Sequence, residues 1–273
     1  EFLFNRSNHE FILNQSNFKD IPGKIISYWL SNKFIRLFID NKPLSNRYFP
    51  GGRNKTHNND KFIRFWWEVG HSKIWEPYDK GGEFRRWYGN LYYFVNWSSE
   101  AKKEYESHGG LYNQNYLNKT GICWSLITTG ENSFRIKSSD EHYDSGSPTI
   151  FHKEFIFEPY VLGYLNSKVT SELVKIMNPT LNLGNTYVLN LPDLIPKEED
   201  KKYLNEVVKN NILLVKKDWD SLEISRDYYR HPLVYMGELK KCFSSYEEKR
   251  LEEYMLLKHN EEVLNQYFIN LAN

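Results

Sequence analysis

The chain has 273 residues, of which 40% are hydrophobic and 16% aromatic, enough to bury one substantial core. Its formal net charge of +1 excludes a uniformly basic protein, and its 2 cysteines lie too far apart for a Cys-x-x-Cys site. We therefore expect no bound metal and a reducing, cytoplasmic setting. No apolar run reaches the ~20 residues of a membrane span, so no membrane partner is expected. The chain begins with Glu1, and we expect it to be a piece of a longer protein.

The first predicted element is a helix over residues 25–38, where apolar residues recur at spacings of three, four and seven before Pro43. A polar loop over 49–60 then leads into residues 61–69, whose alternation of side chains predicts a strand. Further strands are predicted over 92–95, 121–127 and 134–136.

Apolar residues return to helical spacing from Val161 to Ile176, and this predicted helix must end near Asn178-Pro179. A short apolar strand is predicted over 187–192. The run of charged residues that starts at Lys197 changes the composition of the chain. We therefore predict a domain boundary there, with one domain over 1–196 and a second region over 197–273.

Two helices are predicted beyond this boundary, over about 203–215 and 246–271. Ser245 and Glu248 have the spacing of a capping box at the start of the second. Leu257, Leu264 and Leu271 recur every seven residues, so this helix is expected to pack along another one. The predicted fold class is α+β, with a mixed-sheet domain followed by a helical C-terminal tail.

One stretch, over residues 75–90, mixes aromatics, a glycine pair and an arginine pair, in the order WEPYDKGGEFRRWYGN. This mixture suits a surface that lies against a negatively charged polymer, because cations meet phosphates and aromatic rings stack or wedge. From residue 47 to 90 nine cations face five anions, a charge of +4, whereas 197–273 has 13 Lys/Arg and 15 Asp/Glu, a charge of −2. A basic face followed by a neutral-to-acidic tail is typical of a domain that grips phosphates with one part only.

Plainer interpretations stand beside this one. Arg85 and Arg86 could be ordinary surface arginines or partners of Glu83, and on a strand only one of the two would face DNA. Gly81-Gly82 predicts a tight turn and not a phosphate loop, because no Lys-Ser/Thr follows. The tryptophans are expected in the core, because burial of so large a side chain stabilises most. They are Trp66, Trp67, Trp87 and Trp124.

Eight motifs, in the same order, resemble the large adenine-specific DNA methyltransferases of the BREX phage-defence systems, the PglX family. They are Ile21-Pro22-Gly23 with Ser27-Tyr28-Trp29, Asn58 to Arg64 with Trp67-Glu68-Val69, Lys80 to Asn90, Gly121 to Ser125, Leu162 to Val169, Asn178 to Asn182, Asn190-Leu191-Pro192, and Asp218 to Ser221 with His231-Pro232-Leu233. Together these motifs extend over nearly the whole chain.

The resemblance implies that the chain is the specificity half of an N6-adenine methyltransferase, a target-recognition domain for double-stranded DNA followed by helices. The family's catalytic Asn-Pro-Pro-Tyr motif is absent, and no Gly-rich loop after a strand offers an S-adenosylmethionine site. We therefore expect no catalytic residue and no cofactor site in this segment. The full-length protein is expected to use S-adenosylmethionine in an N-terminal methyltransferase domain, with other BREX proteins as further partners.

The predicted DNA-binding residues lie in the loop over 53–58 and in the block over 80–88, because both adjoin strands and have side chains that reach base edges or phosphates. They are Arg53, Asn54, Lys55, Thr56, Asn58, Lys80, Gly82, Arg85, Arg86 and Tyr88. The loop and the block are expected on one side of the body, far from the C-terminal helices.

Three other functions remain open at this point. The chain could be a protein–protein scaffold of the same defence system, with its heptad tail as the docking element. It could be the specificity region of a fused restriction-modification enzyme. An independent nuclease would need a clustered acidic or metal triad, and the acidic residues over 140–144 form a lone run typical of a solvated loop.

Overall fold

The computed structural model describes residues 21–24, 30–52, 54–70, 72–111, 116–128, 130–178, 180–234 and 237–273. Its first helix, α1 (Asn32–Asp40), is capped at its C-terminal end by Asn41 and buries Ile35 and Leu37. The start of the helix predicted over 25–38 lies outside the described residues, as does the predicted DNA-binding residue Arg53.

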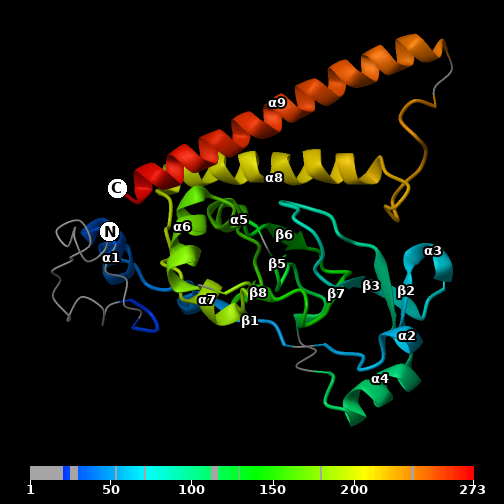
Figure 1. Cartoon of the computed structure of the whole chain (residues 1–273), viewed down its shortest axis with the longest axis horizontal. Coiled ribbons are helices and arrows are strands. Elements are labelled where there is room, and N and C mark those ends of the chain that lie inside the picture. The colour runs from blue at the N-terminus through cyan, green and yellow to red at the C-terminus, as the bar shows by residue number, and fades with distance from the viewer. Residues whose placement is uncertain are drawn as a thin grey trace, which may run out of the picture.

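Two four-stranded sheets form the body (Figure 1). The first has the order β1 (Tyr48–Pro50), β8 (Thr149–His152), β5 (Gly121–Trp124), β6 (Phe134–Lys137), all antiparallel. The second has the order β2 (Ile63–Phe65), β4 (Tyr93–Asn96), β3 (Trp75–Asp79), β7 (His142–Tyr143). β3 and β7 run parallel, so this sheet is mixed. The predicted α+β class is confirmed.

The strand predicted over 61–69 is wrong except at its centre. Residues before and after β2 form two short helices, α2 (Asn59–Phe62) and α3 (Trp66–Val69). Asn58 starts α2, because its Oδ1 accepts the Lys61 N–H at 3.0 Å. Glu68 caps the N-terminal end of α3, because its Oε2 accepts the Phe65 N–H at 2.7 Å. Because both ends of the segment are capped as helices, the strand-like alternation of side chains gives a strand only over residues 63–65.

Two further predictions fail around the first sheet. The helix predicted over 161–176 is broken into α5 (Pro159–Leu165) and α6 (Lys168–Met177). The break lies at Asn166, whose side chain hydrogen-bonds the backbone of Phe134 in both directions at 2.9 and 3.0 Å, and at Ser167, which caps α6. The strand predicted over 187–192 is instead a short helix, α7 (Asn185–Leu189), on the β1 side of the sheet.

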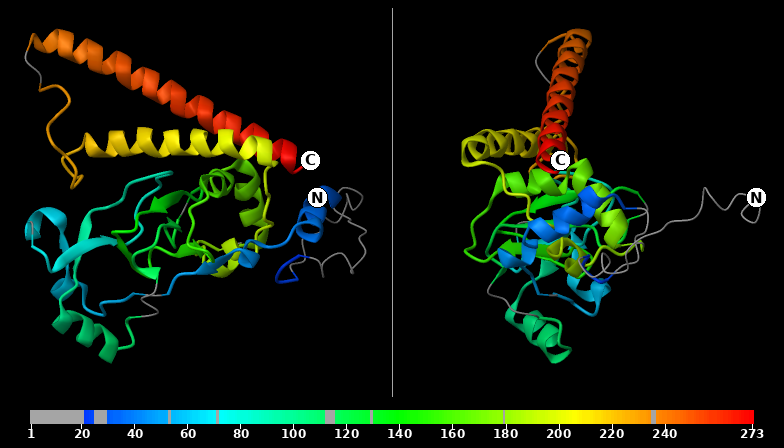
Figure 2. Two further views of the ribbon diagram at one scale, coloured as in Figure 1. Left: turned by 180° about the vertical axis from the view of Figure 1, so that it is seen from behind. Right: turned by 90° about the vertical axis from the view of Figure 1, so that its left-hand side faces the viewer.

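The C-terminal region is a hairpin of two long helices, α8 (Glu198–Asp220) and α9 (Leu239–Leu271). The capping box at Ser245 is wrong, because α9 begins at Leu239. The predicted packing of the heptad is confirmed: Leu264 is buried in the interior, and Asn260 Nδ2 donates to Asn211 Oδ1 of α8 at 2.8 Å. Toward its N-terminal end α9 diverges from α8, so the pair forms an open V (Figures 1 and 2).

One large core joins the first sheet to the helices. It contains Ile122 of β5, Leu162 of α5, Leu204 of α8 and Phe268 of α9, all nearly inaccessible to solvent. A second, smaller core lies between the second sheet and α4 (Ser99–Ser107). The domain boundary at 196/197 stays a prediction. Within the described residues, no helix is both long enough and apolar enough to span a bilayer.

Candidate nucleic-acid interface

The loop over residues 54–59, here called the recognition loop, is bound to the second sheet by backbone bridges and hydrogen bonds at Asn54. The backbone of Asn54 forms bridges with Leu111 and Asp144. The Asn54 carbonyl accepts the Tyr78 hydroxyl at 3.0 Å, and the Lys55 N–H donates to Gly110 at 2.7 Å. The Tyr78 bond ties the loop to β3 and the Lys55 bond ties it to the segment after α4, so the loop is positioned before any ligand arrives.

The outer edge of the recognition loop is polar and exposed. His57, Asn58 and Asn59 are exposed, and Lys55 is half-buried with no carboxylate partner in the described part of the chain. Lys80, which follows β3, joins this edge: its Nζ lies 3.5 Å from Asn59 Oδ1 and 2.6 Å from Asp144 Oδ2. The structure therefore brings Lys80 to the recognition loop, as the sequence predicts.

Two predicted DNA-reading side chains of the recognition loop point inward. Asn54 is 1% exposed and Thr56 is 5% exposed, and Thr56 Oγ1 donates to Asn59 Oδ1 at 3.0 Å. Their burial contradicts the prediction that they reach base edges. Asn54 is buried because its backbone pairs on both sides, which draws the side chain into the body.

The glycine pair forms the tight turn that the sequence predicts. Gly81 and Gly82 have φ of +82° and +119°, a region that favours glycine. The Gly81 N–H donates to Asp79 at 2.7 Å, and the Gly82 carbonyl accepts the Ser125 hydroxyl at 2.8 Å. Gly82 itself is exposed. This turn separates Lys80 from the arginine pair and sends them to different surfaces.

Arg86 is held by the C-terminal helices, so its predicted place far from them is wrong. Its Nη1 donates to Glu261 of α9 at 3.1 Å and its Nη2 to Glu131 at 2.9 Å. Trp87 Nε1 donates to the other oxygen of Glu261 at 2.8 Å. The carboxylate partners of Arg86 are therefore Glu131 and Glu261, and Glu83 is not among them.

Arg85 and Tyr88 lie against α8. The Arg85 guanidinium stacks over Trp219 at 4.8 Å and lies 3.9 Å from Asp218. Tyr88 is buried, with the Lys216 ammonium 4.9 Å from its ring centre. Burial raises the pKa of the Tyr88 hydroxyl to about 12. Arg85, Arg86 and Tyr88 thus contact the helical hairpin; Tyr88 is buried, and the side chains of Arg85 and Arg86 are 27% and 15% exposed.

The tryptophans divide between core and surface. Trp87 and Trp124 are buried in the largest core, which confirms the prediction for these two. Trp66 is partly buried, and its Nε1 donates to the Ile224 carbonyl at 2.8 Å. Trp67 is 48% exposed, so its predicted place in the core is wrong.

A buried cluster of charged side chains lies behind the glycine turn, and its Asp79 accepts the Gly81 N–H. The sequence analysis did not predict this cluster. Asp79 and Arg135 are each 1% exposed and lie 3.4 Å apart. Burial raises the pKa of the neighbouring Cys123 thiol well above its usual value, which removes a thiolate nucleophile. The sequence holds one signal for this buried cluster. Arg135 and Lys137 are two positions apart on a strand, which places both cations on the same face of the sheet.

Two more groups of this cluster titrate near neutrality. Burial raises the pKa of Glu141 to about 7, partly offset by its bond from the Ser138 N–H. Burial lowers the pKa of Lys137 to about 8, and its Nζ donates to the carbonyls of Leu117 and Lys119 at 2.6 and 2.9 Å. Because Glu141 and Lys137 are almost fully buried, we assign them a structural role.

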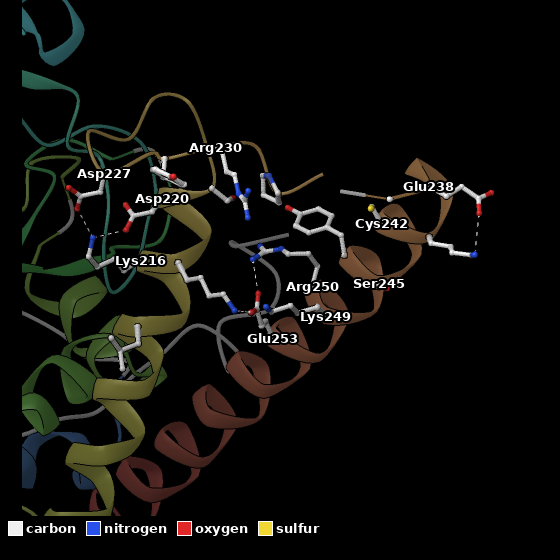
Figure 3. Close-up of a pocket in the computed structure, with 18 residues that line it drawn as sticks. Lys216, Asp220, Asp227, Arg230, Glu238, Cys242, Ser245, Lys249, Arg250 and Glu253 are labelled. Atoms are coloured by element: carbon white, nitrogen blue, oxygen red, sulfur yellow. Dashed lines mark hydrogen bonds and ion pairs between the residues drawn. The ribbon is translucent and has the colours of Figure 1, made fainter. Parts of the chain in front are cut away.

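A cavity of about 940 Å³ lies in the open V between α8 and α9 (Figure 3). Its lining has six Lys/Arg and four Asp/Glu side chains, and several of these are paired: Lys216 bonds Asp220 and Asp227 at 2.6 and 2.7 Å, and Lys217 pairs with Glu253. Across the described ranges no group of three or more His, Cys, Asp or Glu residues could hold a metal ion, and the absence of metal stays a prediction.

Comparisons with known proteins identify relatives of the whole chain. It is 30% identical, over 294 aligned positions, to the adenine-specific methyltransferase PglX of Lacticaseibacillus casei (strain Zhang), a match that covers 97% of this chain. It is 28% identical to the adenine-specific methyltransferase BrxX of Escherichia coli O9:H4 (strain HS), over 94% of this chain. The chain is a relative of PglX and BrxX. The predicted resemblance is confirmed.

The chain spans only about a quarter of these relatives, 24% of PglX and 22% of BrxX. No family model matches it. Among solved structures, it is similar to the Type IIL restriction-modification enzyme MmeI in complex with DNA, at a TM-score of 0.46 and 12% identity. That match covers 82% of this chain and 36% of MmeI.

Proposed function

We propose that this chain is the DNA-sequence-recognition segment of an adenine-specific DNA methyltransferase of a BREX system. The relationship to PglX and BrxX over nearly the whole chain supports this proposal. In the same proposal, methyl transfer belongs to a catalytic domain outside this chain, which binds S-adenosylmethionine. The sequence here lacks the Asn-Pro-Pro-Tyr motif that would stack on an extruded adenine.

One observation carries the proposal: the recognition loop is held in place by the bonds at Asn54 and Lys55 and exposes the polar side chains of residues 57–59. Asn58 and Asn59 are exposed, and each would offer its Nδ2 group to a base edge, because Asn58 Oδ1 already accepts the Lys61 N–H and Asn59 Oδ1 accepts the Thr56 hydroxyl. Lys55 lies on the same edge and would neutralise a phosphate, whereas the neighbouring Lys80 is paired with Asp144 at 2.6 Å. We therefore narrow the proposed DNA-binding set to this edge.

Salt dependence tests this function. We expect the chain to bind duplex DNA weakly and to lose affinity by about tenfold or more between about 50 and 200 mM salt, because few phosphates are neutralised. Lys55→Ala should weaken binding to all sequences alike and lower the salt slope by about 1. Fluorescence anisotropy with labelled duplexes measures both quantities. The matched control is Lys249→Ala, an exposed lysine of α9, and binding that ignores salt would contradict the proposal.

A scaffold function is the second candidate, and the surface of α9 favours it. The diverging half of this helix exposes large apolar side chains, with exposed fractions between 52% and 67%. They are Leu239, Phe243, Leu251, Tyr254 and Met255. Several large exposed apolar side chains on one helix segment would suit a protein–protein contact. The catalytic domain of the same polypeptide or another BREX protein would be its partner.

A further inference from the structure

Three aromatic rings form a ladder on the surface at the end of the second sheet. Phe65 of β2 pairs in register with Tyr93 of β4, and their rings stack at 5.1 Å and 23°. Trp67 of α3 stacks on Phe65 at 4.5 Å and 5°. Trp67 is 48% exposed and Phe65 37% exposed. This set, Trp67, Phe65 and Tyr93, is called the aromatic ladder below.

The aromatic ladder is held rigidly. The carboxylate of Glu68 accepts the Phe65 N–H at 2.7 Å and so fixes the turn into α3. Trp66 packs edge-on against Trp67 at 5.6 Å and 87°, and its Nε1 is tied to the Ile224 carbonyl at 2.8 Å. The Trp67 ring therefore keeps its orientation without a ligand, which lowers the entropy cost of binding one.

The outermost ring is open on one side. Among the described residues, Trp67 has ring contacts with Phe65 on one face and with Trp66 at its edge. A side-chain carbon added at Gly70, which ends α3, would meet no atom within 4 Å in the described part of the chain, so this corner is open. A tryptophan of this exposure adds little to the core, and its free face is available for a planar group.

The charge around the aromatic ladder suits a polyanion. Residues 61–75 have three cations and one carboxylate, and one of the cations, Lys61, pairs with Glu104 at 2.6 Å. That carboxylate, Glu68, is occupied by the Phe65 N–H. Arg64 donates to the carbonyls of Asp60 and Ile63, and neither it nor exposed Lys73 has a carboxylate partner in the described residues. A planar ring in positive surroundings favours a nucleic-acid base over an apolar protein segment.

We propose that the free face of Trp67 stacks on a DNA base that has lost its pairing partner, an inference that rests on the proposed function. An enzyme that modifies adenine within a duplex must extrude it, which leaves the opposite base unpaired and its neighbours unstacked. An aromatic ring stacks on any base, so Trp67 lowers the cost of extrusion without reading sequence. Sequence is read elsewhere, at the recognition loop.

Two duplexes that differ at one position test this inference, one fully paired and one with an abasic site opposite a single base. Stacking on that base is worth on the order of 1–3 kcal/mol. We therefore expect the 273-residue chain to prefer the abasic duplex by about fivefold or more. Trp67→Ala should remove the preference and leave salt-dependent binding to the paired duplex unchanged. Trp67→Phe should keep part of it.

Tyr254→Ala is the matched control, because it removes an exposed aromatic side chain, 61% accessible, from α9; it should keep the full preference. If Trp67→Ala keeps the preference, or if the unchanged chain binds both duplexes equally, the inference is overturned while the proposed function stands. If the unchanged chain binds neither duplex, the proposed function itself fails. Circular dichroism checks that each variant is folded, and Trp67→Phe decides the matter should Trp67→Ala unfold.

Discussion

Replacing Arg86 with alanine is expected to lower the free energy of unfolding by about 2 kcal/mol. The Arg86 side chain is 15% exposed and joins Glu131 to Glu261 of α9. Removing one partner of a fully buried ion pair costs about 3–5 kcal/mol. We expect less here, because Glu131 and Glu261 are 42% and 27% exposed and keep Lys168 and Trp87 Nε1 as partners. Urea unfolding followed by tryptophan fluorescence measures the loss.

The same variant separates two roles for the arginine pair. If Arg86 is structural, the folded fraction of Arg86→Ala should bind duplex DNA as tightly as the unchanged chain. Arg36→Ala, at an exposed position of α1, is the control for loss of one cation and should leave stability nearly unchanged. An Arg86→Ala protein of full stability and lost DNA affinity would restore Arg86 to the DNA-binding set.

Replacing Glu141 with glutamine is expected to stabilise the protein at pH 8 by roughly 3 kcal/mol. Glu141 is 1% exposed, and its pKa in the folded protein is raised from 4.5 to about 7. Between these two pH values the folded protein binds more protons than the unfolded chain. The contribution of Glu141 to stability is therefore present below pH 4.5 and is lost as the pH rises through about 7.

Glutamine keeps an oxygen for the Ser138 N–H and carries no charge, so it does not lose stability in this window. The gain over the unchanged chain should be full at pH 8 and fall below about 1 kcal/mol at pH 5. Glu262→Gln, an exposed glutamate of α9, is the control for loss of one carboxylate. A stability gain that is equal at both pH values would show that the effect is not one of protonation.

Local patterns predicted the elements whose signals lie within their own sequence. The apolar strands at β4, β5 and β6 and the amphipathic helices α8 and α9 belong to this group. The heptad of α9 also predicted its pairing with a second helix, because a seven-residue repeat requires a partner. The failures at Asn58 and Ser167 are side-chain caps, and both could have been recognised from residue type and position.

The site was less predictable, because its partners are remote in sequence. Arg86 is separated by more than a hundred residues from Glu261, and nothing near Arg86 announces that acid. Asn54 is turned inward by backbone pairing with Leu111 and Asp144, which residue type alone does not reveal. Lys80 and the recognition loop came out adjacent as predicted, because both adjoin strands of one sheet.

Lysine acetylation footprinting, with and without duplex DNA at low salt, tests most directly whether the recognition loop contacts DNA. Lys55 lies in the loop and has no carboxylate partner among the described residues, whereas Lys249 lies on α9 at the open V. We expect DNA to protect Lys55 from acetylation by severalfold and to leave Lys249 unchanged, with the protection lost as salt is raised. Protection of Lys249 without protection of Lys55 would contradict the proposed interface and place the DNA on the helical hairpin.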